Sequence, residues 1–363
     1  MPQKLWAISN TMVDLYHTIY DGEIFQSSHC ITLENAVVDF IRSQLQCLGY
    51  QPSAHNPKVY QRQHQQVVLC LVDDFATCGQ TFDQQLPYLF DKNTTVITDN
   101  WISVPTQYRV CRLPASFFGI YSHTPAVNQW QPSRRFNFSV NRIDFKRLLL
   151  LMEIRHRCKH LPDSEHLDLI NFNCWSWNSD NQSPTALLSN FEQQWQNLEA
   201  HQQDLYRSAY EWLVHRMPWR NHDLTHQHQH VGAWVNVIAE TYSSDTTVAL
   251  SEKLFRAMCL PVPWTVYAGR HTVSYLHSLG FDVLSDVVDH WYDDLIETHG
   301  DKVTEFVYAG TAAVDKMKTL DFVWLQQRCQ RAASHNQTVL SHMRQQWPCD
   351  FAHWWSNTVQ SIS

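Results

Sequence analysis

Two neighbouring stretches, Trp234-Val235-Asn236-Val237-Ile238-Ala239-Glu240 and Leu250-Ser251-Glu252-Lys253-Leu254-Phe255, decide the fold of this 363-residue chain. The first is a short apolar run that ends on an acid, which predicts a buried strand. In the second, Ser251 is a natural helix N-cap, with Glu252 and Lys253 in the first helical turn. A strand, a polar loop and a helix in this order indicate an α/β domain.

The charges at these two positions suit a ligand that carries both a ribose and a diphosphate. The carboxylate of Glu240 can accept hydrogen bonds from sugar hydroxyls. The ammonium of Lys253 and the free N–H groups of a helix N-terminus can bind phosphates. On their own, Glu252 and Lys253 are equally well explained as a helix cap with a solvated ion pair. The rest of the segment is needed to choose between these interpretations.

Further pieces follow in a fixed order. An apolar strand is predicted at Pro263-Trp264-Thr265-Val266-Tyr267-Ala268-Gly269, followed by the step Leu279-Gly280-Phe281 and then by Tyr292-Asp293. Upstream, Asn141-Arg142 and Lys146-Arg147 precede an aliphatic run that predicts a helix. This ordered set resembles the nucleotide-sugar-binding half of GT-B glycosyltransferases, including fucosyltransferase-like families and related sugar transferases of phages and bacteria.

The resemblance covers about residues 136–294, under half of the chain. It implies two Rossmann-like domains and a nucleotide-diphosphate sugar as donor substrate, with no cofactor and no metal. Basic side chains would neutralise the departing diphosphate instead. Relatives often have a second acid where this chain has His290. The donor-binding residues that the resemblance implies are Arg142, Arg147, Glu240, Ser251, Glu252 and Lys253.

The first third of the chain predicts a Rossmann-like domain over residues 1–130, which would hold the acceptor. A helix is expected at Ile31–Leu48, with Thr32 as its cap. Three short runs rich in β-branched residues predict strands, and two of these runs end in acids. Such runs are typical of central parallel strands, whose carboxyl ends face a ligand cleft. The expected strands are Val67–Val72, Thr95–Thr98 and Tyr108–Leu113.

Acids after two of these strands are candidates for the general base of an inverting enzyme. They are Asp73, Asp74 and Asp99. A carboxylate in a partly dry cleft can take the proton of the acceptor hydroxyl. Each of the three also has an ordinary interpretation as a helix N-cap or a loop acid.

The second domain is expected over residues 136–345, because Pro125 and Pro132 lie in a stretch with few helix formers. Alternation of apolar runs and helical periodicity predicts further elements in it. The expected strands are Phe136–Val140 and Leu167–Asn173, and the expected helices are Phe145–His160, Phe191–His215 and Val314–Gln346.

The histidine-rich run at 222–230 would place His226, His228 and His230 on one face of a strand, as metal-binding strands do. No second ligand cluster accompanies this run at a diagnostic spacing. An exposed loop is therefore the favoured interpretation, and the enzyme is expected to need no metal.

The composition bears on compartment and partners. Ten cysteines without a Cys-x-x-Cys pair predict buried free thiols in a reducing compartment. No apolar run is long enough to span a membrane. The expected location is cytoplasmic, in the host cytoplasm if the protein is viral. A formal net charge of −8 disfavours broad attraction to nucleic acid.

Two classes of acceptor remain open. One is a modified base of phage DNA, whose phosphates Arg134 and Arg135 could contact. The other is a surface glycan. Two other functions fit the same fold: a degenerate transferase that binds a nucleotide or a protein, and a nucleotide-sugar epimerase that needs no acceptor.

Overall fold

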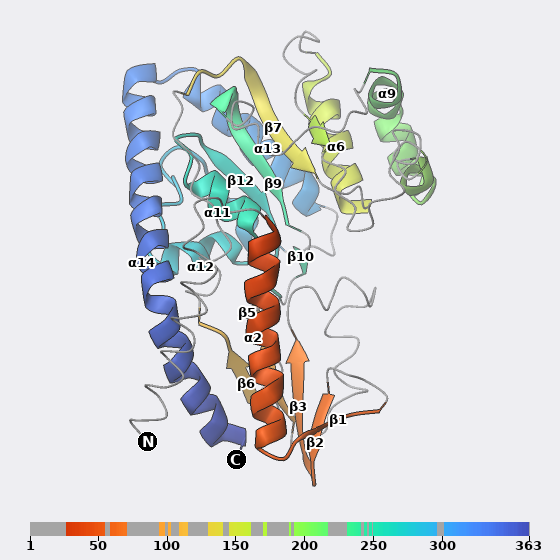
Figure 1. Ribbon diagram of the computed structural model, residues 1–363. Helices are drawn as coiled ribbons and strands as arrows, with labels where there is room; N and C mark the ends of the chain where they lie inside the picture. Colours follow the sequence, from red (N-terminus) through yellow and green to blue (C-terminus); the bar gives the residue numbers. More distant parts are fainter. Residues whose placement is uncertain are drawn as a thin grey trace. The chain divides into compact units, whose positions relative to one another are not determined.

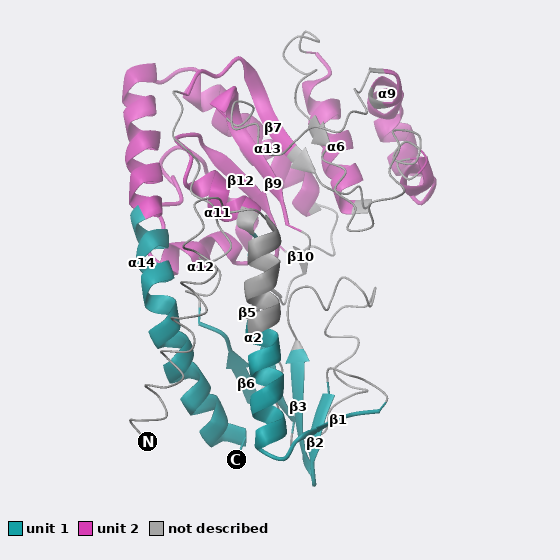
Figure 2. Ribbon diagram, viewed as in Figure 1, with its two compact units in different colours: residues 1–123, 246–252, 338–363 teal, residues 124–245, 253–337 magenta. Residues whose placement is uncertain are grey.

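The computed structural model describes residues 27–54, 59–70, 94–98, 101–102, 109–114, 130–140, 145–160, 170–172, 189, 192–216, 231–240, 243–244, 247–248, 250–295 and 301–362. It has the α/β class that the sequence predicts (Figure 1). The chain divides into two compact units (Figure 2). Unit 1 comprises residues 1–123, 246–252 and 338–363, and unit 2 comprises residues 124–245 and 253–337.

The described sheet of unit 1 has five strands in the order β1-β2-β3-β4-β6. Strands β1, β2 and β3 pair antiparallel, whereas β3, β4 and β6 pair parallel. The strands that the sequence predicts in this third of the chain are confirmed over the described residues. The bounds are β1 Gln51–Pro52, β2 Val59–Arg62, β3 Gln65–Cys70, β4 Thr94–Thr98 and β6 Arg109–Arg112. A two-residue ladder joins β5 (Trp101–Ile102) to β11 (Thr247–Val248).

Helix α2 (Ser27–Cys47) confirms the predicted helix of unit 1. The cap predicted at Thr32 was wrong, because the helix begins at Ser27 and Thr32 lies inside it. Three side chains at helical spacing are fully buried. They are Val37, Ile41 and Leu45. They share a hydrophobic core with residues near the carboxyl end of α14 (Phe322–Ile362), namely Trp347, Phe351, Trp355 and Ile362.

Unit 2 contains a sheet of four described strands that are all parallel, in the order β8-β7-β9-β12. The bounds are β7 Arg134–Val140, β8 Ile170–Phe172, β9 Ala233–Ala239 and β12 Trp264–Tyr267. The chain passes from β7 outward to β8, then returns past β7 to β9 and continues to β12. The direction of winding therefore reverses between β7 and β9. In open α/β sheets this reversal is the topological switch point, where ligands bind outside the carboxyl ends of the strands.

Helices cover the sheet of unit 2, which explains why its strands are apolar without alternation. Helix α13 packs on β9 and β12 and contacts α6. Figure 1 shows α11 in front of this sheet and α13 behind it. A Cβ atom at Gly310 of α13 would lie 3.4 Å from the ring of Phe136, so the helix packs closely on β7 at this position. The bounds are α6 Phe145–Cys158, α9 Ala200–Arg216, α11 Glu252–Met258, α12 Thr272–Ser278 and α13 Asp301–Met317.

Two predicted helices differ from the structure. The helix expected at 191–215 is interrupted at 197–199, and α9 begins only at Ala200. The side-chain amide of Gln203 donates to the carbonyl oxygens of Trp195 and Leu198, at 3.1 Å each. These bonds satisfy carbonyl groups at the end of the first segment. The helical tail is likewise divided, because α13 ends at Met317 and α14 begins at Phe322.

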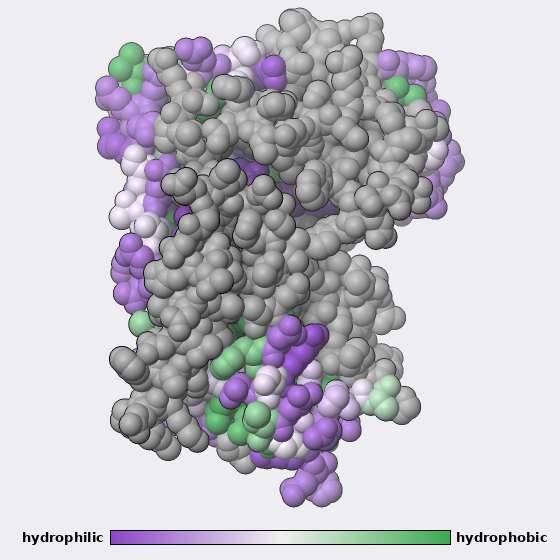
Figure 3. Space-filling model, in the orientation of Figure 1, coloured by the Kyte–Doolittle hydropathy of each residue, from purple (hydrophilic) through white to green (hydrophobic). Residues whose placement is uncertain are grey.

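On the face drawn in Figure 3, the coloured residues along the edges of unit 2 are mostly hydrophilic. Within the described parts of the chain, no helix is long and apolar enough to cross a membrane. Cys158, Cys259 and Cys329 are buried free thiols, as expected. Cys47 and Cys349 are exposed, contrary to that expectation, since they lie on outward positions of α2 and α14.

Candidate functional site

The carboxyl end of β9 brings together two predicted donor-binding residues. Glu240 follows the strand directly, and its backbone N–H donates to the carbonyl oxygen of Tyr267 at 2.9 Å. Its side chain is buried, with 5% of the residue exposed. Arg147 is only 3% exposed, and its Nη2 lies 3.5 Å from the carbonyl oxygen of Ala239, a long hydrogen bond. A buried cation and a buried acid therefore both lie at the carboxyl end of β9.

Local folding explains how Arg147 reaches this position. Strand β7 ends at Val140 and helix α6 begins at Phe145, so Arg147 lies in the first turn of α6, beside the carboxyl edge of the sheet. The N-terminus of a helix carries partial positive charge. Burial weakens solvent screening, so charges here act strongly on any ligand at this edge. The position is also next to the switch point between β7 and β9.

The predicted helix start after β9 is confirmed, because α11 begins at Glu252. Leu254 is fully buried and Phe255 packs against Phe281, with ring centroids 5.7 Å apart. These contacts fix the first turn of α11, on which Lys253 lies half-buried. Ser251 directly precedes the helix and is also half-buried.

Several predicted site residues fall outside the described residues. These are the general-base candidates Asp73, Asp74 and Asp99, the donor candidate Arg142, and the histidines His226, His228 and His230. The side chain of Glu252 is not described either, although its backbone is helical. The roles expected of these residues stay predictions.

Tyr292 and Asp293 have structural roles, because they hydrogen-bond to β12 and α12. The buried carboxylate of Asp293 accepts hydrogen bonds from the backbone N–H groups of Val273 and Ser274, each at 3.0 Å. It thereby satisfies free donors at the start of α12. The hydroxyl oxygen of Tyr292 accepts a hydrogen bond from the N–H of Val266 in β12, at 3.2 Å. The short 3-10 helix η1 (Trp291–Asp294) is thus tied to both β12 and α12.

The Leu279-Gly280-Phe281 step is also structural. Gly280 has φ +90°, a left-handed conformation that favours glycine. The N–H of Gly280 donates to the carbonyl of His277 at 2.9 Å, and that of Phe281 to the carbonyl of Leu276 at 3.2 Å. This pair of bonds is a Schellman motif, which ends α12. Both motifs therefore have structural roles at the ends of α12.

His290 links Val283 to Tyr292 through two hydrogen bonds. Its Nε2 lies 2.8 Å from the carbonyl oxygen of Val283, which can only accept, so Nε2 carries the proton. Nδ1, 2.9 Å from the hydroxyl of Tyr292, is then the acceptor. Burial lowers the pKa of His290 and raises the pKa of Tyr292. The imidazole is thereby held neutral.

Lys302 is a site residue that the sequence interpretation missed. It lies in the first turn of α13 and is only 2% exposed. Its Nζ donates to the carbonyl oxygen of Ala268 at 2.9 Å and lies 5.8 Å from the ring centroid of Tyr267. Lys302 thus lies at the end of β12, as Arg147 does at the end of β9. The sequence does contain an indication that Lys302 is buried, because it is a single lysine among the apolar residues that include Val303 and Phe306.

Arg135, proposed from sequence as a DNA-phosphate contact, has a different position. It is 8% exposed, and its guanidinium pairs with the carboxylate of Asp315 on α13. A buried, paired guanidinium is not presented to a nucleic acid. This contact is therefore removed from the DNA hypothesis.

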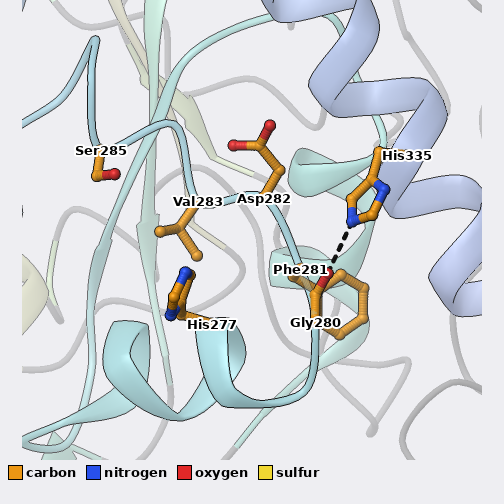
Figure 4. Close-up of a pocket in the computed structure, with 7 residues that line it drawn as sticks. All are labelled: His277, Gly280, Phe281, Asp282, Val283, Ser285 and His335. Carbon is orange, nitrogen blue, oxygen red and sulfur yellow. Dashed lines mark hydrogen bonds between the residues drawn. The ribbon is translucent and has the colours of Figure 1, made fainter.

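One pocket with a volume of about 270 Å³ lies beside the end of α12 (Figure 4). His335 bonds to the carbonyl of Gly280 at 2.8 Å, and Asp282 pairs with Arg328 at 2.7 Å. Although burial raises the pKa of Asp282, the hydrogen bonds from Arg328 prevail and lower it. The carboxylate is therefore occupied by an ion pair. The lining residues are His277, Gly280, Phe281, Asp282, Val283, Ser285 and His335.

Among the residues whose positions the structure gives, no group of three His, Cys, Asp or Glu side chains could hold a metal ion. No protein-family model matches the chain, and a search of curated proteins finds no significant match.

Proposed function

We propose that the chain is a glycosyltransferase of GT-B architecture, with two Rossmann-like domains, that transfers a sugar from a nucleotide-diphosphate sugar. The observation that carries this proposal is the switch point between β7 and β9, with buried Arg147 and Glu240 beside it. Ligands of open parallel sheets bind at such positions. In this proposal unit 2 holds the donor and unit 1 holds the acceptor.

The charges at this edge match the parts of such a donor. The guanidinium of Arg147, assisted by the N-terminus of α6, suits the diphosphate. The carboxylate of Glu240 suits the hydroxyl groups of the ribose. Lys253, in the first turn of α11, adds a second cation.

The proposed step breaks the bond between the anomeric carbon and the diphosphate oxygen and forms a bond to an acceptor oxygen. Negative charge develops on the leaving diphosphate, and fixed cations stabilise it without a metal. A carboxylate of unit 1 takes the proton of the acceptor hydroxyl, for which Asp73, Asp74 and Asp99 are the candidates. A modified DNA base and a surface glycan are both compatible acceptors.

The proposal is tested by thermal unfolding with a panel of nucleoside diphosphates and their sugars. A ligand at a hundred times its dissociation constant stabilises a single site by about 2.7 kcal/mol. At least one member of the panel is expected to raise the melting temperature. The shift should be reduced in Arg147→Lys and Glu240→Gln but retained in Arg331→Gln, an exposed arginine of α14. A panel without any effect on the wild-type protein contradicts the proposal.

A transfer assay then separates the acceptors. Labelled nucleotide sugars are incubated with the protein and with either hydroxymethylated DNA or a glycan mixture. Label on one of the two identifies the acceptor class. Altered sugar released from the donor alone indicates an epimerase instead.

A further inference from the structure

The loop between β12 and α12 is held by hydrogen bonds along its length. The carbonyl of Ala268 accepts from the ammonium of Lys302 at 2.9 Å, and the carbonyl of Gly269 accepts from the hydroxyl of Thr272 at 2.6 Å. The N–H of His271 donates to the carbonyl of Asp293 at 2.9 Å. The backbone of this loop is therefore preorganised at the carboxyl edge of the sheet.

Arg270 is the exception within this loop. The residue is half-buried, and its Nε atom is buried without any hydrogen-bond acceptor among the described residues. A guanidinium is always charged, and a buried donor without an acceptor is costly. Such unsatisfied groups are rare in native structures and call for an explanation.

The acids beside Arg270 do not supply that acceptor, because both have other partners. The carboxylate of Asp293 accepts from the N–H groups of Val273 and Ser274. The carboxylate of Asp294 lies 3.0 Å from the Nδ1 atom of His271. Among the described residues, neither carboxylate accepts a hydrogen bond from the Nε–H of Arg270.

The place of Arg270 beside the sheet indicates which kind of ligand it could bind. It follows the last residue of β12, Tyr267, by three residues, at the same edge as Arg147 and Glu240, since β9 and β12 are parallel neighbours. Lys302 contributes a second buried cation at the end of β12. The ends of these two adjacent strands therefore carry the cations Arg147, Arg270 and Lys302 beside the acid Glu240.

We propose that Arg270 binds a phosphate group of the ligand at this edge. A guanidinium can offer Nε–H and one Nη–H in parallel to two oxygens of a single phosphate. Binding of the phosphate would give the Nε–H of Arg270 the acceptor that it lacks in the free protein. The anion-binding role of Arg270 follows from its own geometry. Its assignment to the diphosphate of a nucleotide rests on the function proposed above.

The test uses the full chain and isothermal titration calorimetry with inorganic pyrophosphate, uridine and guanosine diphosphates, and the two nucleosides. Arg270→Met removes all guanidinium donors, and Arg270→Lys retains the charge without the paired donors. Arg331→Gln, an exposed arginine of α14, is the matched control. Arg270→Met is expected to weaken binding of pyrophosphate and of the diphosphates on the order of ten- to a hundredfold, because hydrogen bonds to charged groups are lost. Binding of the nucleosides should be unchanged.

A second readout separates binding from structure. The free Arg270→Met protein is expected to melt at the wild-type temperature or above it, because a buried unsatisfied donor has been removed. Lower melting temperatures for both variants with unchanged phosphate affinity would show a structural role and overturn the inference.

The outcomes distinguish the two proposals. Wild-type binding of pyrophosphate that needs Arg270, without tighter binding of either nucleotide, supports the anion site and counts against the nucleotide donor. Nucleotide binding that is equally tight in Arg270→Met overturns the role of Arg270 and leaves the transferase proposal intact. A wild-type protein that binds none of the phosphate compounds overturns both.

Discussion

The two sheets of this chain differ in how their strands are wound. In unit 1 the described strands follow one another across the sheet in chain order, from β1 to β6. In unit 2 the order β8-β7-β9-β12 contains a reversal. A reversal sends consecutive connections to opposite faces, so the loops diverge and leave a crevice at the strand ends. The winding order therefore distinguishes the sheet of unit 2 from that of unit 1, and it makes the ends of β7 and β9 the candidate site.

The cores of the two sheets also differ in origin. The core of unit 1 joins α2 and its strands to residues near the end of the chain, whereas the sheet and helices of unit 2 come from residues 130–337. This comparison suggests substitutions that affect one unit and spare the other.

The largest effect is expected for Phe351→Ala. Phe351 is fully buried, and its ring meets that of Phe40 edge to face with centroids 5.8 Å apart. Removing a buried phenylalanine ring costs roughly 3–5 kcal/mol. Urea denaturation should show this loss, and His353→Ala, an exposed position on the same helix, should not. Nucleotide affinity measured where the variant is folded should stay at the wild-type value. A matching loss of affinity would break the separation between the two units.

The next effect concerns the donor site of unit 2. Lys253→Ala is expected to reduce transfer and diphosphate affinity by about a hundredfold, on the order of 2.7 kcal/mol. Stability should change by less than about 1 kcal/mol, because Lys253 is a half-buried residue at a helix start. Calorimetry and melting curves test both statements. Unchanged nucleotide affinity would move the donor site away from α11.

A smaller effect is expected from acid, through His290. Burial lowers its pKa below the ordinary value of 6.5. At a pH between the pKa of His290 in the folded protein and its pKa in the unfolded chain, the unfolded chain binds a proton at His290 and the folded protein does not. Stability is therefore full above about pH 6.5 and falls as the pH drops toward the folded pKa, by at most about 1.4 kcal/mol per pH unit. Below the folded pKa this loss stops growing.

The measurement is urea denaturation of wild type and His290→Gln between about pH 5 and 8. The difference between the two curves isolates this residue from the other histidines. The groups that face His290 are Tyr292, Asp289, Asp293 and the ring of Trp264. If the free energy of unfolding depends on pH in the same way in both proteins, His290 is not held as a neutral imidazole in the folded state.

The smallest effect is expected from chelation. Transfer should continue in EDTA, because fixed cations take the place of a metal in the proposed mechanism. Complete inactivation that added metal reverses would instead make ligands of His226, His228 and His230.

The sequence did not predict the short strands β1, β2, β5, β10 (Ser243–Ser244) and β11. It did predict β3, β4, β6, β7, β8, β9 and β12, because these are apolar or β-branched runs with clear ends. It placed Arg147, Glu240 and Lys253 correctly on their elements for the same reason. It failed where the end of a helix depends on one side chain. An example is Gln203, whose side-chain amide donates hydrogen bonds to carbonyl groups at the break before α9. Lys302 and Arg270 were missed because their role depends on the ends of β9 and β12 being neighbours, a pairing that local periodicity does not contain.

The discontinuous core of unit 1 has a consequence for synthesis. Strand residues such as Val67 and Ile97 leave the ribosome long before Trp347 and Phe351, with which they share a core. At ordinary elongation rates of about 5–20 residues per second, this delay is on the order of tens of seconds. During that time the apolar side chains lack part of their cover, while the sheet of unit 2 is completed. The strands of unit 1 therefore reach their native packing only after Trp347 and Phe351 have been synthesised, and exposed apolar side chains favour aggregation in the interval.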